Sequence, residues 1–302
     1  MALEFDTRFE PRHGEAVEVV PNIRRITAPN PSPFTFHGTN SYIVGGKGPL
    51  AVIDPGPEDE AHLAALMRAL DGRPVSHILV SHTHRDHSPL AARLAELTGA
   101  QTAAEGPHRP ARPLEIGEIN PLDASADADF RPDLTLADGE LVEGDGWKLR
   151  ALHTPGHTAN HCAFALEGTG ITFSADHVMA WSTTIVAPPD GAMTDYMASL
   201  DRLLERDDYL LLPGHGGPVG NPRQFMRGLK THRKMRERAI LERLRAGERR
   251  IPEIVKSIYR DTDPRLHGAA ALSVLAHLED LVSRGRAKAD NTPSLEARFS
   301  PA

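Results

Sequence analysis

The sequence predicts a layered α/β domain followed by a smaller helical module, and three observations support this prediction. Short apolar runs that end at glycine or proline alternate with helical patterns through the first two thirds of the chain. From residue 221 onward, long amphipathic helical patterns replace this alternation. The charge balance also changes: residues 223–302 carry 18 Lys and Arg against 10 Asp and Glu, a net +8, whereas residues 1–222 carry 16 against 31, a net −15. We therefore predict two domains, residues 1–222 and 223–302.

The expected strands of the first domain are short apolar runs that lead into turns or polar loops. They are SYIVGG (41–46), LAVIDPG (50–56), SHILVSH (76–82), WKLRALHTPGHT (147–158), HCAFAL (161–166), GITFSADH (170–177) and YLLLPGHGG (209–217). The expected helices have apolar residues at helical spacing. They are EDEAHLAALMRALDG (58–72), SPLAARLAELTG (88–99) and MTDYMASLDRLLERDD (193–208).

The second domain is expected to contain three helices and a terminal hairpin. The helices are predicted at 223–247, 251–260 and 268–285, and the two short strands lie around an Asn-Thr-Pro-Ser turn within 286–300. This order predicts a winged-helix-like module. The basic face of the helix at 223–247 would either steer RNA phosphates or simply be solvated.

Composition limits the protein class. No apolar stretch approaches the roughly 20 residues that span a bilayer, so no membrane partner is expected. The first fifteen residues are charged and lack the apolar core of a signal peptide. The single cysteine, Cys162, excludes an intrachain disulfide and suits a reducing compartment, so we expect a cytoplasmic protein.

The segment SHTHRDHSPL (81–90) contains the densest group of metal-ligand side chains in the chain. His82 and His84 are two residues apart, so on extended backbone their side chains leave on the same side. Asp86 and His87 follow after the chain has turned. Each pair can bind one metal ion, but neither pair completes a coordination shell.

Further ligands are expected on loops that directly follow apolar strands, at His157, Asp176 and His215. Together with the 82–87 segment, these residues supply enough ligands for two metal ions. The first would bind His82, His84 and His157; the second would bind Asp86, His87 and His215; and Asp176 would bridge them. A bridging water would lose its proton and attack the substrate as hydroxide, so Asp86 also counts among the catalytic groups. Two Zn²⁺ ions are favoured by the His-rich set, and Mn or Fe would also be accepted.

The chain resembles the metallo-β-lactamase superfamily, whose His-x-His-x-Asp-His motif stands here at residues 82–87. This resemblance implies an α+β fold, an αββα sandwich with a dinuclear site at one edge. It also implies that Asp54 of AVIDPG supports the ligands, and a turn-capping carboxylate is the alternative. The lactamase-β-2-like branch, which adds a C-terminal winged helix, is similar in PFTFHGTNSYIVG, HTPGHT and DGAMTDYMASL. Bulky Met179 and Trp181 depart from that pattern beside the site.

Three functions are consistent with these observations. A metal-bridging hydroxide would hydrolyse a small ester or thioester, which the acidic first domain, the apolar VMAW segment (178–181) and the thioesterases of the branch favour. The alternative is an endoribonuclease that cleaves single-stranded RNA, favoured by the basic tail. The third is a nucleic-acid-binding module with a structural metal site. The sequence leaves the oligomeric state open.

Three other features have two interpretations each. His177, next to Asp176, would donate a proton to a leaving group from the pocket wall, or pack. Asn40 would be an oxyanion donor or cap a turn. Trp181 and the Pro188–Pro189 pair would form a substrate-covering loop or pack. We expect structural roles for His153 and His161.

Overall fold

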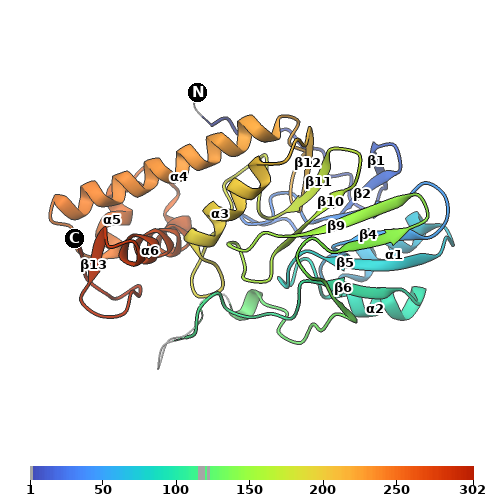
Figure 1. Cartoon of the computed structure of the whole chain (residues 1–302), viewed down its shortest axis with the longest axis horizontal. Helices are drawn as coiled ribbons and strands as arrows, with labels where there is room; N and C mark the ends of the chain where they lie inside the picture. The colour runs from blue at the N-terminus through green and yellow to red at the C-terminus, as the bar shows by residue number, and fades with distance from the viewer. Residues whose placement is uncertain (1–2, 115–119, 121–122) are drawn as a thin grey trace.

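Two β-sheets form the centre of the molecule, with helices on both outer faces and a helical module at one end (Figure 1). The structure is a computed structural model that describes residues 3–114, 120 and 123–302. The seven-stranded sheet is built, in spatial order, from β1 (Val17–Val20), β2 (Ile23–Thr27), β3 (Asn40–Val44), β4 (Leu50–Ile53), β5 (Val75–Val80), β6 (Gln101–Ala104) and β7 (Leu134–Thr135). The five-stranded sheet is built from β12 (Leu210–Pro213), β11 (Ile171–Ala175), β10 (Cys162–Leu166), β9 (Trp147–His153) and β8 (Leu141–Gly144).

The main core lies between these two sheets. Tyr42 and Ile53 of the first sheet pack with Phe164 and Phe173 of the second, and all four side chains are buried. The rings of Tyr42 and Phe173 meet edge to face, with centroids 5.2 Å apart. Burial on both faces explains why the strands are near-continuous apolar runs.

Helices cover the outer face of each sheet. α1 (Glu60–Leu70) and α2 (Leu90–Thr98) pack on the seven-stranded sheet through Leu66, Leu70 and Leu94. α3 (Met193–Leu204) and the first half of α4 (Pro222–Arg245) pack on the five-stranded sheet. This arrangement confirms the predicted αββα sandwich.

The C-terminal module has its own core. It contains the second half of α4, α5 (Ile251–Ile258), α6 (His267–Ser283) and an antiparallel pair of short strands, β13 (Ala287–Ala289) and β14 (Phe299–Pro301). Two short 3₁₀ helices complete the described elements, η1 (Asp123–Ser125) in the first part of the chain and η2 (Pro264–Leu266) before α6. The helices and the hairpin follow the predicted order.

The long helix α4 belongs to both cores. Met226 and Leu229 pack with α3 and the second sheet, whereas Ile240 and Leu241 pack with α5 and α6. The boundary at residues 222 and 223 stays a prediction. Within the described ranges, no helix combines the length and the apolar character that crossing a membrane requires.

Candidate metal centre

The seven predicted ligand residues converge at one end of the two sheets, although they are spread over 134 positions of the sequence. Each lies on a loop that follows a strand. His82, His84, Asp86 and His87 follow β5, His157 follows β9, Asp176 follows β11 and His215 follows β12. Among the described residues, three groups hold their ligand atoms within 4.8 Å of one another.

The first group contains His82, His84 and His157. Nδ1 of His84 lies 3.0 Å from Nε2 of His82 and 3.0 Å from Nε2 of His157. Burial, followed by the neighbouring imidazoles, lowers the pKa of His82 well below its usual value, and burial with His157 lowers that of His84 to about 3. These rings therefore stay neutral and keep lone pairs available at neutral pH.

The second group contains Asp86, His87 and His215. Oδ2 of Asp86 lies 3.2 Å from Nε2 of His215 and 3.4 Å from Nε2 of His87. Burial alone would lower the pKa of His215, but the carboxylates of Asp176 and Asp86 outweigh it and raise that pKa to about 9. Asp86 keeps 24% of its side chain exposed, so solvent reaches this group at Asp86, while His87 and His215 are buried.

Asp176 lies between these two groups and forms the third group with His82 and His87. Its Oδ2 is 3.2 Å from Nε2 of His215 and 3.6 Å from Nε2 of His157, and its Oδ1 is 3.6 Å from Nε2 of His87. A Cβ at Gly214, directly after β12, would lie 2.4 Å from Asp176 Oδ1, so only glycine lets the His215 loop approach this closely. Asp176 therefore contacts members of both groups, and its bridging role stays a prediction.

Two backbone carbonyls determine the protonation of the imidazoles. Nδ1 of His157 donates to the carbonyl of Ile185 at 2.7 Å, and Nδ1 of His215 donates to the carbonyl of Gly38 at 3.2 Å. Because a carbonyl only accepts, Nδ1 of each ring carries a proton, and Nε2 is the nitrogen that faces the cluster. Burial keeps His157 neutral, so its Nε2 presents a lone pair, whereas the carboxylates favour a second proton on Nε2 of His215, which a bound cation would replace.

Asp54 determines the orientation of two more rings. It accepts hydrogen bonds from Nδ1 of His87 at 3.0 Å and from the Ser81 hydroxyl and backbone N–H at 2.7 Å each. Since the Ser81 hydroxyl donates to Asp54, it accepts from Nδ1 of His82 at 3.0 Å. Asp54 thus supports the cluster, as the resemblance implied, rather than capping a turn.

The donor set fits divalent cations. Nε2 of His82 and Nε2 of His157 both point at Nδ1 of His84 at 3.0 Å, and a single proton there could satisfy only one of them, whereas a cation could bind all three nitrogens. Around His87 and His215 the carboxylates outweigh burial and raise the pKa of both rings, so this side of the cluster favours positive charge, which a divalent cation would supply. Within the described part of the chain, Nε2 of His87 and Oδ1 of Asp176 are buried without a hydrogen-bond partner. Nitrogen and carboxylate ligands in these numbers suit divalent metal ions.

His177 lies behind the cluster. Its ring is fully buried, packs on Tyr196 at 4.6 Å and on His161 at 5.7 Å, and belongs to none of the three ligand groups. Its catalytic role stays a prediction, and its burial favours the packing interpretation. His161 and His153 bind Thr154 Oγ1 and the Leu136 carbonyl, as expected of structural residues.

Asn40 is neither an oxyanion donor nor a turn cap. It lies in β3, fully buried, and its amide Nδ2 donates to the carbonyls of Pro213 at 3.1 Å and Gly216 at 2.9 Å. Both amide hydrogens are therefore used to hold the loop that carries His215. Sequence reasoning missed the neighbouring Thr39, whose hydroxyl donates to Asp86 Oδ2 at 3.1 Å.

Trp181 stacks on Phe36 beside the cluster. Their rings are 4.8 Å apart and nearly parallel, at 10°. A Cβ at Gly216, the residue after His215, would lie 2.8 Å from Trp181 and 3.6 Å from Phe36. The loops that carry Phe36 and Trp181 therefore meet in an aromatic pair next to His215. Pro188 and Pro189, by contrast, are buried.

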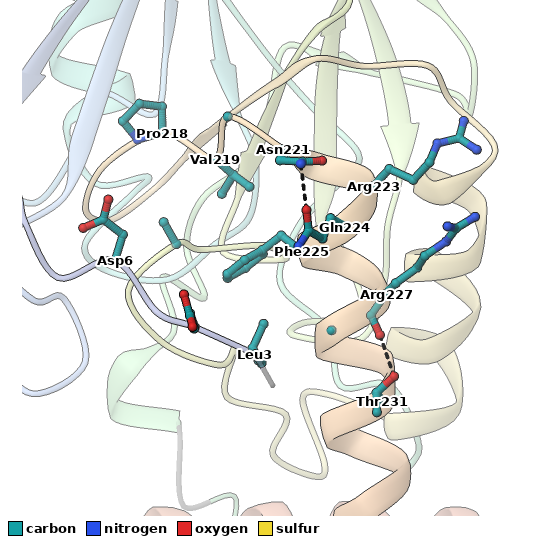
Figure 2. A pocket seen from close by; sticks show the side chains of 14 residues that line it. Leu3, Asp6, Pro218, Val219, Asn221, Arg223, Gln224, Phe225, Arg227 and Thr231 are labelled. Atoms are coloured by element: carbon teal, nitrogen blue, oxygen red, sulfur yellow. Dashed lines mark hydrogen bonds between the residues drawn. The ribbon is translucent and has the colours of Figure 1, made fainter. Parts of the chain in front are cut away.

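A cavity of about 810 Å³ lies elsewhere, between the N-terminal segment and the start of α4 (Figure 2). Leu3, Asp6, Phe225 and Arg227 are among its lining residues, and none of the seven candidate ligands lines it. The hollow is therefore separate from the His and Asp cluster.

An αββα sandwich with His and Asp clusters at the strand ends defines a class of metal-dependent proteins. Residues 34–215 match the model of the metallo-beta-lactamase superfamily, and residues 251–294 match the beta-lactamase associated winged helix domain. The chain belongs to the metallo-beta-lactamase superfamily and is a hydrolase.

Individual relatives cover nearly the whole chain. A Drosophila melanogaster protein described as beta-lactamase-like protein 2 homolog is 28% identical over 286 residues, which are 91% of this chain and 92% of that protein. An atrochrysone carboxyl ACP thioesterase of Claviceps purpurea is 28% identical over 268 residues, 86% of this chain and 79% of that protein. The crystal structure of a metallo-beta-lactamase family protein from Thermus thermophilus is similar with a TM-score of 0.75 and 26% identity, covering 94% of this chain and 100% of that one.

Proposed function

We propose that this protein is a dinuclear metal hydrolase that cleaves a small ester or thioester. The convergence of five imidazoles and two carboxylates supports two metal sites that share Asp176. His82, His84 and His157 would hold one ion, and Asp86, His87 and His215 the other. We favour Zn²⁺ because imidazole dominates the set, and Mn or Fe would also be accepted.

The protein's own residues position these ligands. Asp54 keeps a proton of His87 on the outer nitrogen directly and that of His82 through Ser81. The carbonyls of Ile185 and Gly38 do the same for His157 and His215. Two divalent ions held there would supply Lewis acidity, which would lower the pKa of a water molecule and stabilise negative charge on the substrate.

The surroundings of the cluster favour an acyl substrate. The Phe36–Trp181 pair packs against Gly216 and offers apolar surface beside His215. Some relatives are described as acyl-carrier thioesterases. An ester or thioester with an apolar acyl group suits this surface better than a phosphodiester.

The second candidate function is cleavage of single-stranded RNA. Arg223, Arg227, Lys234 and Arg238 are exposed along α4, and such a basic stripe can bind phosphates. The third interpretation, a binding module with a structural metal, does not agree with membership of a hydrolase superfamily. The proposed cytoplasmic location depends on the single cysteine, which is buried and reduced.

A turnover screen tests the substrate. Zinc-loaded protein is incubated with acyl-thioesters, small aryl esters and end-labelled single-stranded RNA, in parallel with the His82→Ala variant. We expect thioester or ester cleavage that the variant loses together with part of its metal. RNA cleavage without ester cleavage would favour the second candidate, and equal turnover by both proteins would overturn the proposed site.

A further inference from the structure

Arg233 is a buried cation in the middle of α4. The residue is 4% exposed, and within the described ranges no carboxylate pairs with its guanidinium. Its Nη2 donates to the carbonyl of Thr184, and the guanidinium lies 5.0 Å above the ring of Tyr196. Burying an unpaired charge is unfavourable, so its few contacts have to compensate for desolvation.

The contact with Thr184 leads directly to two candidate ligands. The single hydrogen of the Thr184 hydroxyl is shared between the backbone carbonyls of Asp176, at 2.6 Å, and His177, at 2.9 Å. The carbonyl of the next residue, Ile185, accepts from Nδ1 of His157 at 2.7 Å. A shift of residues 184–185 would therefore move Asp176. It would also remove the carbonyl that accepts from Nδ1 of His157 and fixes the orientation of that ring.

Tyr196 holds the same segment from the α3 side. Its hydroxyl donates to the carbonyl of His177 at 3.2 Å, and the aromatic face accommodates the guanidinium of Arg233. α3 and α4 lie side by side in Figure 1, so both helices support the Asp176 loop from outside the sandwich.

We propose that Arg233 is a positioning residue of the metal centre, which it acts on through Thr184, and that α4 serves to hold the Asp176 and His157 loops. The inference rests on the proposed metal function. A planar guanidinium explains both contacts at once, since it can donate to the carbonyl from its edge while its face rests on the ring. An apolar side chain at this position would provide neither.

The test compares two arginines of one helix. Arg233→Met removes the contact with the 184–185 segment, whereas Arg236→Met removes a similar stacking contact, over Tyr259 at 4.1 Å, far from that segment. Metal affinity is measured by competition with a chromophoric chelator, and Co²⁺ absorption reports the ligand geometry. We expect Arg233→Met to bind Zn²⁺ about 10–100-fold more weakly, with an altered Co²⁺ spectrum, and Arg236→Met to match the wild type.

Two further variants keep the inference falsifiable. Thr184→Val removes the hydrogen bonds of the hydroxyl at nearly constant side-chain volume, so this variant should also bind metal more weakly. Because both residues act through the same segment, the loss of affinity in the double variant with Arg233→Met should be smaller than the sum of the two single losses. If Arg233→Met does not fold, the second variant is Arg233→Lys, which keeps the positive charge but lacks the planar guanidinium. It should then bind Zn²⁺ more weakly than the wild type.

The outcomes separate the two proposals. Wild-type affinity and spectrum in a folded Arg233→Met variant, or in Arg233→Lys where the first does not fold, would overturn the role of Arg233 alone. Failure of the wild-type protein itself to bind transition metals would overturn the metal function and, with it, this inference.

Discussion

At the scale of single residues, the metal centre depends on hydrogen-bond acceptors that stand behind the rings. Ile185, Gly38 and Asp54 each accept from the outer nitrogen of an imidazole, so the inner nitrogen is free to bind a cation. Residues that never touch a metal thus decide which nitrogen is the ligand.

Asp54→Asn tests this dependence. An amide in place of the carboxylate accepts fewer hydrogen bonds and presents an N–H to one of its present donors, so the rings of His87 and His82 lose their fixed orientation. We expect zinc affinity to fall about 10–100-fold. The matched change Asp59→Asn, at the N-cap of α1, should leave affinity unchanged because asparagine caps equally well. Chelator competition measures both, and equal affinities would contradict the prediction.

His277 predicts an acid-dependent loss of stability. Burial, followed by Arg233 and Arg236, lowers its pKa to about 3. The unfolded chain therefore takes up a proton near pH 6.5 while the folded chain does not, so stability falls as pH drops from 6.5 toward 3, by up to about 1.4 kcal/mol per pH unit. In urea titrations of metal-free protein between pH 6 and 4, His277→Gln should show a slope shallower by about this amount. Identical slopes would contradict the buried, neutral state.

The sequence predicted the side chains of the site but not their orientation. His82, His84 and Asp86 carry a recognisable spacing, and His157, Asp176 and His215 each follow an apolar run. The carbonyls of Gly38 and Ile185 have no sequence signature, because every residue has a carbonyl. The oxyanion role considered for Asn40 was wrong because its amide hydrogens are used within the fold.

At the scale of elements, strands with apolar runs were predictable and short or irregular ones were not. β3, β4, β5 and β9 to β12 coincide with predicted runs, whereas β1, β2, β6, β7 and β8 were not predicted. β6 reads QTAA and β7 has two residues, so neither carries enough apolar side chains for a pattern. β1 is a partly exposed edge strand, whose pairing depends on β2 rather than on its own sequence.

The His157 loop packs on α3 at Gly156. A Cβ there would lie 2.3 Å from Cα of Tyr196, and the backbone φ of +138° also disfavours a side chain. We expect Gly156→Ala to reduce the free energy of unfolding by about 1–3 kcal/mol and to weaken metal binding. Gly268→Ala in α6, where open space surrounds the position, should leave stability unchanged or raise it by up to about 1 kcal/mol. Denaturant melts distinguish the two, and equal stabilities would contradict the close approach.

At the scale of the whole molecule, α4 couples the sandwich to the C-terminal module. Leu229 is buried against the second sheet and α3, and Leu241 is buried against α5 and α6. The predicted division at residue 222 would therefore separate the sandwich from part of its own core.

A cooperative melt follows from this sharing. Leu229→Ala and Leu241→Ala should each cost about 2–5 kcal/mol and shift one common unfolding transition. Intrinsic fluorescence and circular dichroism, recorded together, would report that transition at the same midpoint. Two transitions, each moved by only one variant, would show instead that the two parts unfold independently.

The continuity of α4 also restricts how this chain can change length. Each residue of an α-helix advances the axis by about 1.5 Å and turns it by about 100°. One residue inserted between Arg233 and Ile240 would swing the terminal module around the sandwich by more than a quarter of a revolution. Natural insertions and deletions should therefore accumulate in surface loops and be absent from this stretch of helix, because its length sets the angle between the residues that pack in one core and those that pack in the other.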